Sequence, residues 1–159
     1  MEQTILSKWL KGTLVGIGLC GLFVYVAVVP ALADHILQKY PEFASAALPW
    51  KAFIWCSALP CFAVLWYAWK IACNIGADCS FTDENAKNLQ YIAGLAAGDA
   101  LFFFLGNILL LFLNMNHPGI VLVSCVVVFI GIAVAVASAA LSHLVKKAVA
   151  LQEQSDLTI

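Results

Sequence analysis

The sequence predicts an all-α integral membrane protein in which residues 1–159 form a single bundle of four transmembrane helices joined by short loops. Composition supports this fold class, because 64% of the residues are hydrophobic and only 11% are charged. A soluble domain is typically about half apolar and a quarter charged. A chain this short has too few charged residues to cover so much apolar surface in water, so we expect the lipid bilayer to be its solvent.

Four apolar segments each reach the roughly 20 residues that cross a bilayer. They lie at about residues 12–32, 50–69, 91–113 and 119–141. The only charged residues within them are Lys51, near the outer edge of the second, and Asp99 in the third. We expect Pro60 to interrupt and kink the second helix, since proline lacks an amide donor. Only five residues separate the last two segments, so these helices should be antiparallel neighbours.

The first segment has a second interpretation as a secretory signal. Lys8 and Lys11 precede an apolar stretch that ends in Ala31-Leu32-Ala33, which resembles a cleavage site. Cleavage after Ala33 would leave three spans. The apolar stretch is longer than the usual core of a signal peptide, so we expect it to remain as a transmembrane helix.

The lysines predict the orientation of the bundle. An even number of spans places six of them on one side: Lys8, Lys11, Lys70, Lys87, Lys146 and Lys147. Only Lys39 and Lys51 fall on the other side. Because short cytoplasmic flanks carry the excess of positive charge, both termini and the loop between the second and third spans are expected in the cytoplasm.

Several functional classes are not expected. The net charge is -1 and the chain contains no arginine, which argues against direct binding of nucleic acid. No paired carboxylates, metal-ligand cluster or nucleophile–base pair can be recognised, so we expect neither enzymatic activity nor a cofactor. Cys73, Cys79 and His143 suggest a zinc site, but the spacing is not a known ligand motif and a fourth ligand is missing. No metal is therefore expected.

Asp99 is the most informative single residue. A charge at the middle of a transmembrane helix costs at least ~2.5 kcal/mol, so such a residue faces the protein interior or has a functional role. On a helical wheel, Asn107 and Asn114 share its face and extend an intramembrane polar stripe. Two interpretations are open: a proton- or ion-responsive group, or a buried carboxyl bonded to the hydroxyls of Ser138 and Ser142.

Small residues repeat at four-residue spacing in two of the helices. One stripe contains Gly12, Gly16 and Cys20, and the other contains Gly131, Ala135 and Ala139. Such stripes allow helix backbones to approach closely in lipid. We expect them to pack helices within the bundle, with a homo-oligomer interface as the alternative.

The loop before the third span carries a helix-start signature. Thr82 is placed to cap the helix, and Asp83 and Glu84 in the first turn complement the helix dipole. Phe81 precedes the cap and is expected to act as a hydrophobic staple against Ala86 or the second helix. The third helix should therefore begin at the membrane surface, before its apolar part.

The same loop resembles a known family. Phe81-Thr82-Asp83-Glu84-Asn85, followed by Lys87, Leu89 and Ile92, is similar to the signature of domain-of-unknown-function family 2975 (DUF2975). The resemblance implies a four-span protein of the bacterial inner membrane. Members of that family are often encoded beside a small helix-turn-helix regulator, which implies a cytoplasmic protein partner.

These observations favour a non-enzymatic regulatory or accessory membrane protein that acts through a cytoplasmic partner. The alternative is a small oligomeric channel, or a proton- or ion-coupled transporter that uses Asp99. This alternative requires a homo-oligomer, because four helices rarely enclose a pore alone.

Overall fold

The computed structural model describes residues 3–156, and every element in this range is helical. The elements are α1 (Gln3–Phe23), the π-helix η1 (Val24–Val28), α2 (Val29–Lys39), the 3-10 helix η2 (Pro41–Ala46), α3 (Ala47–Gly76), α4 (Asp83–Phe112) and α5 (Pro118–Asp156). Four helical runs within these residues are long and apolar enough to cross a membrane: Gln3–Lys39, Pro41–Gly76, Asp83–Phe112 and Pro118–Ser155. The predicted all-α class with four candidate spans is therefore confirmed.

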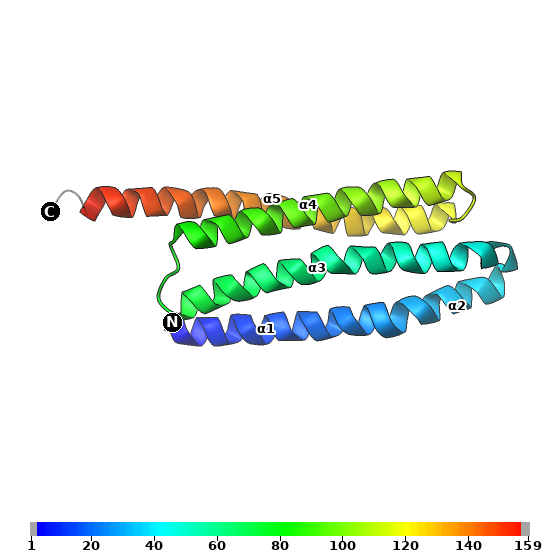
Figure 1. The fold of residues 1–159 in the computed structure, drawn as a ribbon, viewed down its shortest axis with the longest axis horizontal. Helices are drawn as coiled ribbons and strands as arrows, with labels where there is room; N and C mark the ends of the chain where they lie inside the picture. Colours follow the sequence, from blue (N-terminus) through cyan, green and yellow to red (C-terminus); the bar gives the residue numbers. More distant parts are fainter. Residues whose placement is uncertain (1–2, 157–159) are drawn as a thin grey trace.

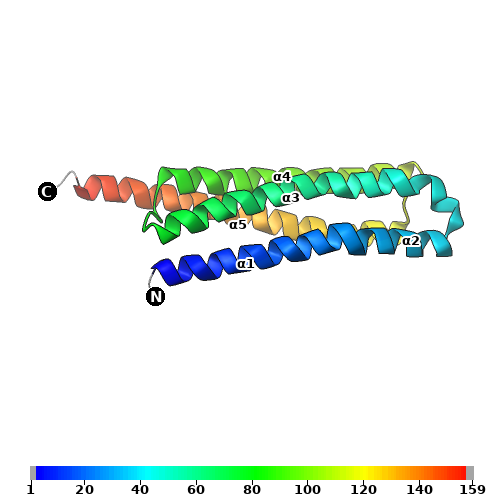
Figure 2. The same ribbon diagram turned by 60° about the horizontal axis from the view of Figure 1, so that its bottom comes forward.

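The helices form two antiparallel hairpins that lie side by side (Figure 1). One hairpin contains α1, α2 and α3, and the other contains α4 and α5. Each long helix packs on the next one in the chain: α1 on α3, α3 on α4, and α4 on α5. Within residues 3–156, α5 does not pack against α1, so no contact closes the row of helices between its two ends. In Figure 2, which is turned by 60°, the ribbon of α5 is drawn between those of α3 and α1. The start of α1 and the end of α5 lie at the same end of the bundle.

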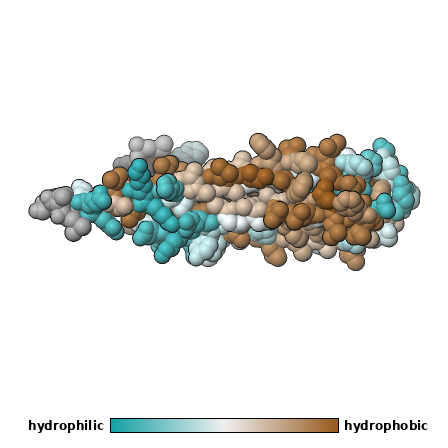
Figure 3. All heavy atoms as spheres, turned by 90° about the horizontal axis from the view of Figure 1, so that it is seen from above, coloured by the Kyte–Doolittle hydropathy of each residue, from teal (hydrophilic) through white to brown (hydrophobic). Residues whose placement is uncertain are grey.

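The surface and the interior have the pattern of a membrane protein. Large apolar side chains point outward, with Phe112 80% and Leu122 72% exposed. Hydrophobic residues cover much of the length of the molecule, and hydrophilic ones gather toward its two ends (Figure 3). The buried residues are mostly small or polar, including several serines, asparagines and alanines. Helices in lipid associate through close packing and polar contacts, which such residues provide.

Small residues form the seam between α4 and α5. A Cβ at Gly131 would lie 3.1 Å from the Cβ of Ala100, and Ala135 is buried. Ser138 and Ser142 continue the seam, whereas Ala139 is exposed. The predicted stripe thus packs within the bundle at Gly131 and Ala135. The next residue in the seam is Ser138 and not Ala139, because the seam follows the seven-residue spacing of near-parallel helices.

The predicted packing role of the stripe on the first helix is wrong. A Cβ at Gly12 or Gly16 would meet no atom of the described chain within 4 Å, and Cys20 is exposed. Instead, α1 meets α3 through Gly18, whose Cβ position lies 3.7 Å from Leu65, and through the buried Ser7. The prediction failed because residue spacing identifies a helix face but does not say which face packs against the neighbouring helix.

Candidate functional site

A backbone irregularity and a proline lie opposite each other within the first hairpin. The π-helix η1 contains Tyr25, and π-bulges of this kind are frequent at functional sites. Opposite it, α3 continues as a helix through Pro60, so the predicted interruption does not occur. Proline still removes one helical hydrogen bond. Ser57 and Cys61, on either side of Pro60, both contact the Tyr25 hydroxyl.

These residues form a polar cluster with Asp99, here called the midspan cluster: Tyr25, Ser57, Cys61 and Asp99. The Tyr25 hydroxyl lies 3.3 Å from Ser57 Oγ and 3.8 Å from Cys61 Sγ. The Cys61 thiol donates to Asp99 Oδ2 at 3.5 Å. A chain of polar contacts therefore crosses from the first span through α3 to α4.

Asp99 is incompletely satisfied within this cluster. Its Oδ1 atom is buried and has no hydrogen-bond partner among the described residues. Asp99 lies roughly 24 Å along α4 from Asp83, at 1.5 Å per residue, which is near the middle of the helix. In the described part of the chain the only ion pair joins Lys51 and Asp34, so Asp99 has no counter-ion there.

The predicted hydroxyl partners of Asp99 are wrong. Ser142 Oγ donates instead to the carbonyl oxygen of Ala86 at 2.7 Å. Ser138 is buried in the α4–α5 seam. Asp99 faces α3, and the thiol of Cys61 occupies the place expected for a serine. Cys61 lies within an apolar segment, and its position one residue after Pro60 carries no signal for this contact.

The predicted polar stripe of Asp99, Asn107 and Asn114 is not continuous in the structure. Asn107 is buried, and its Oδ1 accepts from Asn116 Nδ2 at 2.9 Å. Its own amide donates to the carbonyl oxygen of Phe103 at 2.8 Å. Asn114 lies beyond the end of α4 with a φ of 56° and is exposed. The amide that meets Asn107 therefore comes from Asn116, because the chain reverses after Phe112 and turns a later residue inward.

A second polar cluster lies at the end of the bundle that holds the termini. Thr82 is extended, and its side chain accepts from the backbone N–H of Asn85 at 3.3 Å, which confirms the predicted cap. Asp83 and Glu84 occupy the first turn of α4, as predicted. Phe81 is 56% exposed, so the expected staple does not bury it.

The side chain of Asn85 forms hydrogen bonds that hold this loop in place. This side chain is only 1% exposed. Its amide nitrogen donates to the carbonyl oxygens of Cys79 and Ser80, both at 3.0 Å, and its Oδ1 accepts from Asn74 at 2.8 Å. The loop is thus fastened to the end of α3. We call Asn74, Thr82 and Asn85 the loop cluster.

The start of α1 is joined to the same region. Ser7 Oγ donates to the carbonyl oxygen of Ala72 at 2.6 Å, and Ser80 Oγ donates to Gln3 Oε1 at 3.3 Å. A Cβ at Gly76 would lie only 2.6 Å from Ser7 Oγ, so this approach requires glycine. Among residues 3–156, no three potential metal-ligating side chains lie together, and this includes Cys73, Cys79 and His143.

The fold and its polar clusters define a multi-pass membrane protein with one carboxylate at mid-span and a fastened interhelical loop. The chain belongs to the DUF2975 family, described as a protein of unknown function, whose model matches residues 31–159. It is similar to the uncharacterized membrane protein YoaS of Bacillus subtilis (strain 168), with 27% identity over 159 residues that cover 95% of this chain and 96% of that protein. No solved structure matches the chain.

Proposed function

We propose that the chain is a non-enzymatic regulatory membrane protein that binds a cytoplasmic protein partner at the end of α5. The observation that supports this is the length of α5. Its 39 residues span about 58 Å at 1.5 Å per residue, against a hydrocarbon core of about 30 Å. Much of the helix must therefore lie outside the bilayer.

The register of α4 and α5 locates the projecting part. The hydrogen bond from Ser142 to Ala86 sets Ser142 against the first turn of α4. Residues beyond about 146 consequently extend past the start of α4, as the red end of the helix shows in Figure 1. Leu151 on this segment is 57% exposed, and Phe81 is exposed at the same end of the bundle.

Charge supports a cytoplasmic location for this end. Six of the eight lysines lie at it, the arrangement typical of the cytoplasmic side of a bacterial inner membrane. Lys11 Nζ lies 5.7 Å from the ring centre of Trp69, and Lys70 Nζ lies 5.9 Å from that of Trp66. Aromatic rings beside lysines are typical of the membrane interface.

The partner that the family resemblance suggests is a small helix-turn-helix regulator encoded beside the chain. An exposed amphipathic helix end offers apolar residues such as Leu151 between charged ones such as Lys147 and Glu153, which suits docking into a groove of another protein. Binding there would hold the regulator at the membrane and away from DNA.

The experiment is co-expression of the membrane protein with such a regulator and with a reporter of its target promoter. We expect the double variant F81S/L151S to release the regulator and change reporter output. The matched control is L48S, because Leu48 is 75% exposed at the opposite end of the bundle. Equal reporter output in wild type, double variant and control would contradict the proposal.

A second candidate function is proton- or ion-coupled transport through a homo-oligomer. The buried Asp99 Oδ1 has no hydrogen-bond partner among residues 3–156, and its cluster joins three spans, which favours this candidate. The four helices form an open row, so a pathway would have to lie between copies of the chain. In proteoliposomes, a flux that D99N and D99L both abolish would support this candidate. Unchanged flux, or none in wild type, would contradict it.

A further inference from the structure

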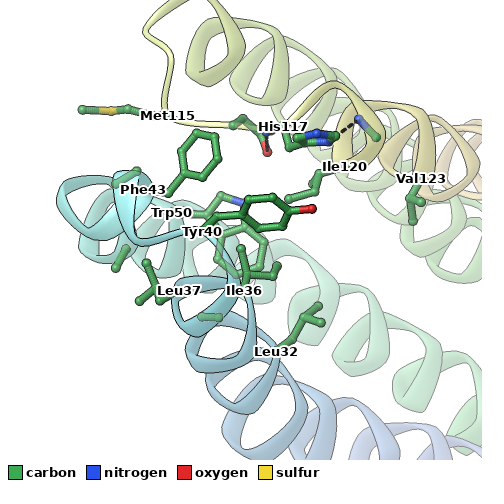
Figure 4. Close-up of a pocket in the computed structure, with 15 residues that line it drawn as sticks. Leu32, Ile36, Leu37, Tyr40, Phe43, Trp50, Met115, His117, Ile120 and Val123 are labelled. Atoms are coloured by element: carbon green, nitrogen blue, oxygen red, sulfur yellow. Dashed lines mark hydrogen bonds between the residues drawn. The ribbon is translucent and has the colours of Figure 1, made fainter.

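A cavity of about 370 Å³ lies between the two hairpins, at the end opposite the termini. Its walls come from α2, η2 and the start of α3 on one side, and from the α4–α5 turn and the start of α5 on the other (Figure 4). The cavity lies where no helix contact in the described chain joins α1 or α2 to α5.

The lining is almost entirely carbon. Leu32, Ile36 and Ile120 face the cavity together with the ring of Trp50. Val123 also lines it and is 68% exposed, so the cavity opens toward the lipid-facing surface of α5. An apolar hollow of this kind gives water few hydrogen bonds. The material beside the opening is the hydrocarbon of the bilayer.

Polar groups gather at the outer rim. The Tyr40 and His117 rings lie 6.0 Å apart between their centres, across the two hairpins. The backbone N–H of Gly119 donates to His117 Nδ1 at 3.0 Å, drawn as the dashed line in Figure 4. A neutral imidazole that accepts at Nδ1 carries its proton on Nε2. His117 therefore presents a donor that no bond within the described chain uses.

Charged side chains also lie at this end of the bundle. Lys51 Nζ is paired with Asp34 Oδ1 at 3.1 Å, which neutralises both. Lys39 has no carboxylate partner in the described residues, and its Nζ lies 5.8 Å from the ring centre of Tyr40. Glu42 follows at the start of η2 and adds one negative charge at this end. Lys39 and His117 thus offer a cation and a donor toward a phosphate, and the Glu42 carboxylate lies at the same end of the bundle for an amine.

We propose that this cavity binds one acyl chain of a bilayer phospholipid, with the phosphate held beside Lys39 and His117. The apolar walls and the side opening fit the chain, and one cation and one carboxylate at this end, Lys39 and Glu42, fit a zwitterionic headgroup such as phosphatidylethanolamine. The bound lipid would fill the space between α2 and the start of α5, which are not in contact within the described residues. The site is independent of the partner proposed at the end of α5.

Native mass spectrometry of the full chain in detergent, with added dipalmitoyl phosphatidylethanolamine, tests the site. We expect one lipid to stay bound after the micelle is removed. I120F should fill the cavity and lower lipid occupancy by about tenfold or more. The matched control L122F should not, because Leu122 lies on the same helix but points away from the cavity.

Equal occupancy in I120F and L122F, or no retained lipid in wild type, would overturn the proposal. A lipid-free dimer that only I120F disrupts would also overturn it, because a second copy would then be the occupant. Circular dichroism shows whether the variants are folded.

Trp50 allows an independent measurement on chains with the lining otherwise unchanged. A phospholipid brominated on its acyl chain should quench fluorescence in a saturable way, and W50F should lose the saturable part. W55F is the control, because Trp55 is 47% exposed and does not line the cavity. Quenching that rises without saturation, or that is equal in W50F and W55F, would contradict a defined site.

Discussion

Ser142 on α5 donates a hydrogen bond of 2.7 Å to the carbonyl oxygen of Ala86 on α4, and the two residues are 1% and 0% exposed. This contact lies where the small residues of the seam allow the two backbones to approach. It fixes the register of the second hairpin. The register in turn determines how much of α5 continues past α4.

Replacing Ser142 by alanine should destabilise the hairpin modestly. Hydrogen bonds between helices in membranes contribute on average about 0.6 kcal/mol, and the cavity left by the hydroxyl is small. Unfolding by sodium dodecyl sulfate in mixed micelles measures the change. S142L should cost more than S142A, because its side chain has no space against Ala86. A139L is the control, since Ala139 is exposed, and an equal loss in A139L would contradict this account.

Asn85→Ala should destabilise the loop more strongly. The substitution removes three hydrogen bonds of a fully buried side chain and leaves the amide of Asn74 without its acceptor. An unsatisfied buried polar group costs about 1–3 kcal/mol. Hydrogen exchange of residues 77–82 and unfolding in detergent measure the effect.

The control for Asn85→Ala is Gln90→Ala on the exposed side of the same helix. Thr82→Ala should fall between the two, because the loss of a helix cap costs about 1 kcal/mol. Similar exchange rates in N85A and Q90A would show that the loop cluster does not hold the loop.

Gly106 tests the packing of α3 on α4. A Cβ at Gly106 would overlap the ring of Phe53, which lies against Phe102 and Phe103 with ring centres 5.1 and 5.4 Å away. G106A should therefore destabilise the fold by about 1–3 kcal/mol, the usual cost of overpacking. G94A on the same helix meets no atom of the described chain within 4 Å. It should be neutral or stabilising, because alanine favours helix by up to about 1 kcal/mol. Equal thermal stability of the two variants would contradict this packing.

The sequence predicted the features that depend on residues close together in the chain. The four spans follow from the length of the apolar runs, and the cap at Thr82 follows from a side chain and a backbone group three residues apart. The partners of Asp99 and Asn107 depend on how helices rotate about their axes and on where the chain reverses. Neither is set by spacing, so Cys61 and Asn116 were not foreseen. The cavity lies between the two hairpins, so the sequence of either hairpin alone does not indicate it.

The orientation of the bundle provides the last prediction. Six lysines lie at the end that holds the start of α1 and the end of α5, and two lie at the other. The positive-inside rule counts lysines and arginines in short flanks and not net charge, so the pairing of Lys51 with Asp34 leaves the six-to-two split unchanged. The positive-inside rule then places the end of α5 in the cytoplasm.

Green fluorescent protein fused after Ile159 should fluoresce, and alkaline phosphatase fused there should be inactive. Phosphatase inserted between Ala44 and Ser45, in the loop of the first hairpin, should be active. The reverse pattern would place the end of α5 on the outer side of the membrane and remove the basis for a cytoplasmic partner. The lipid site would then be testable in the opposite leaflet.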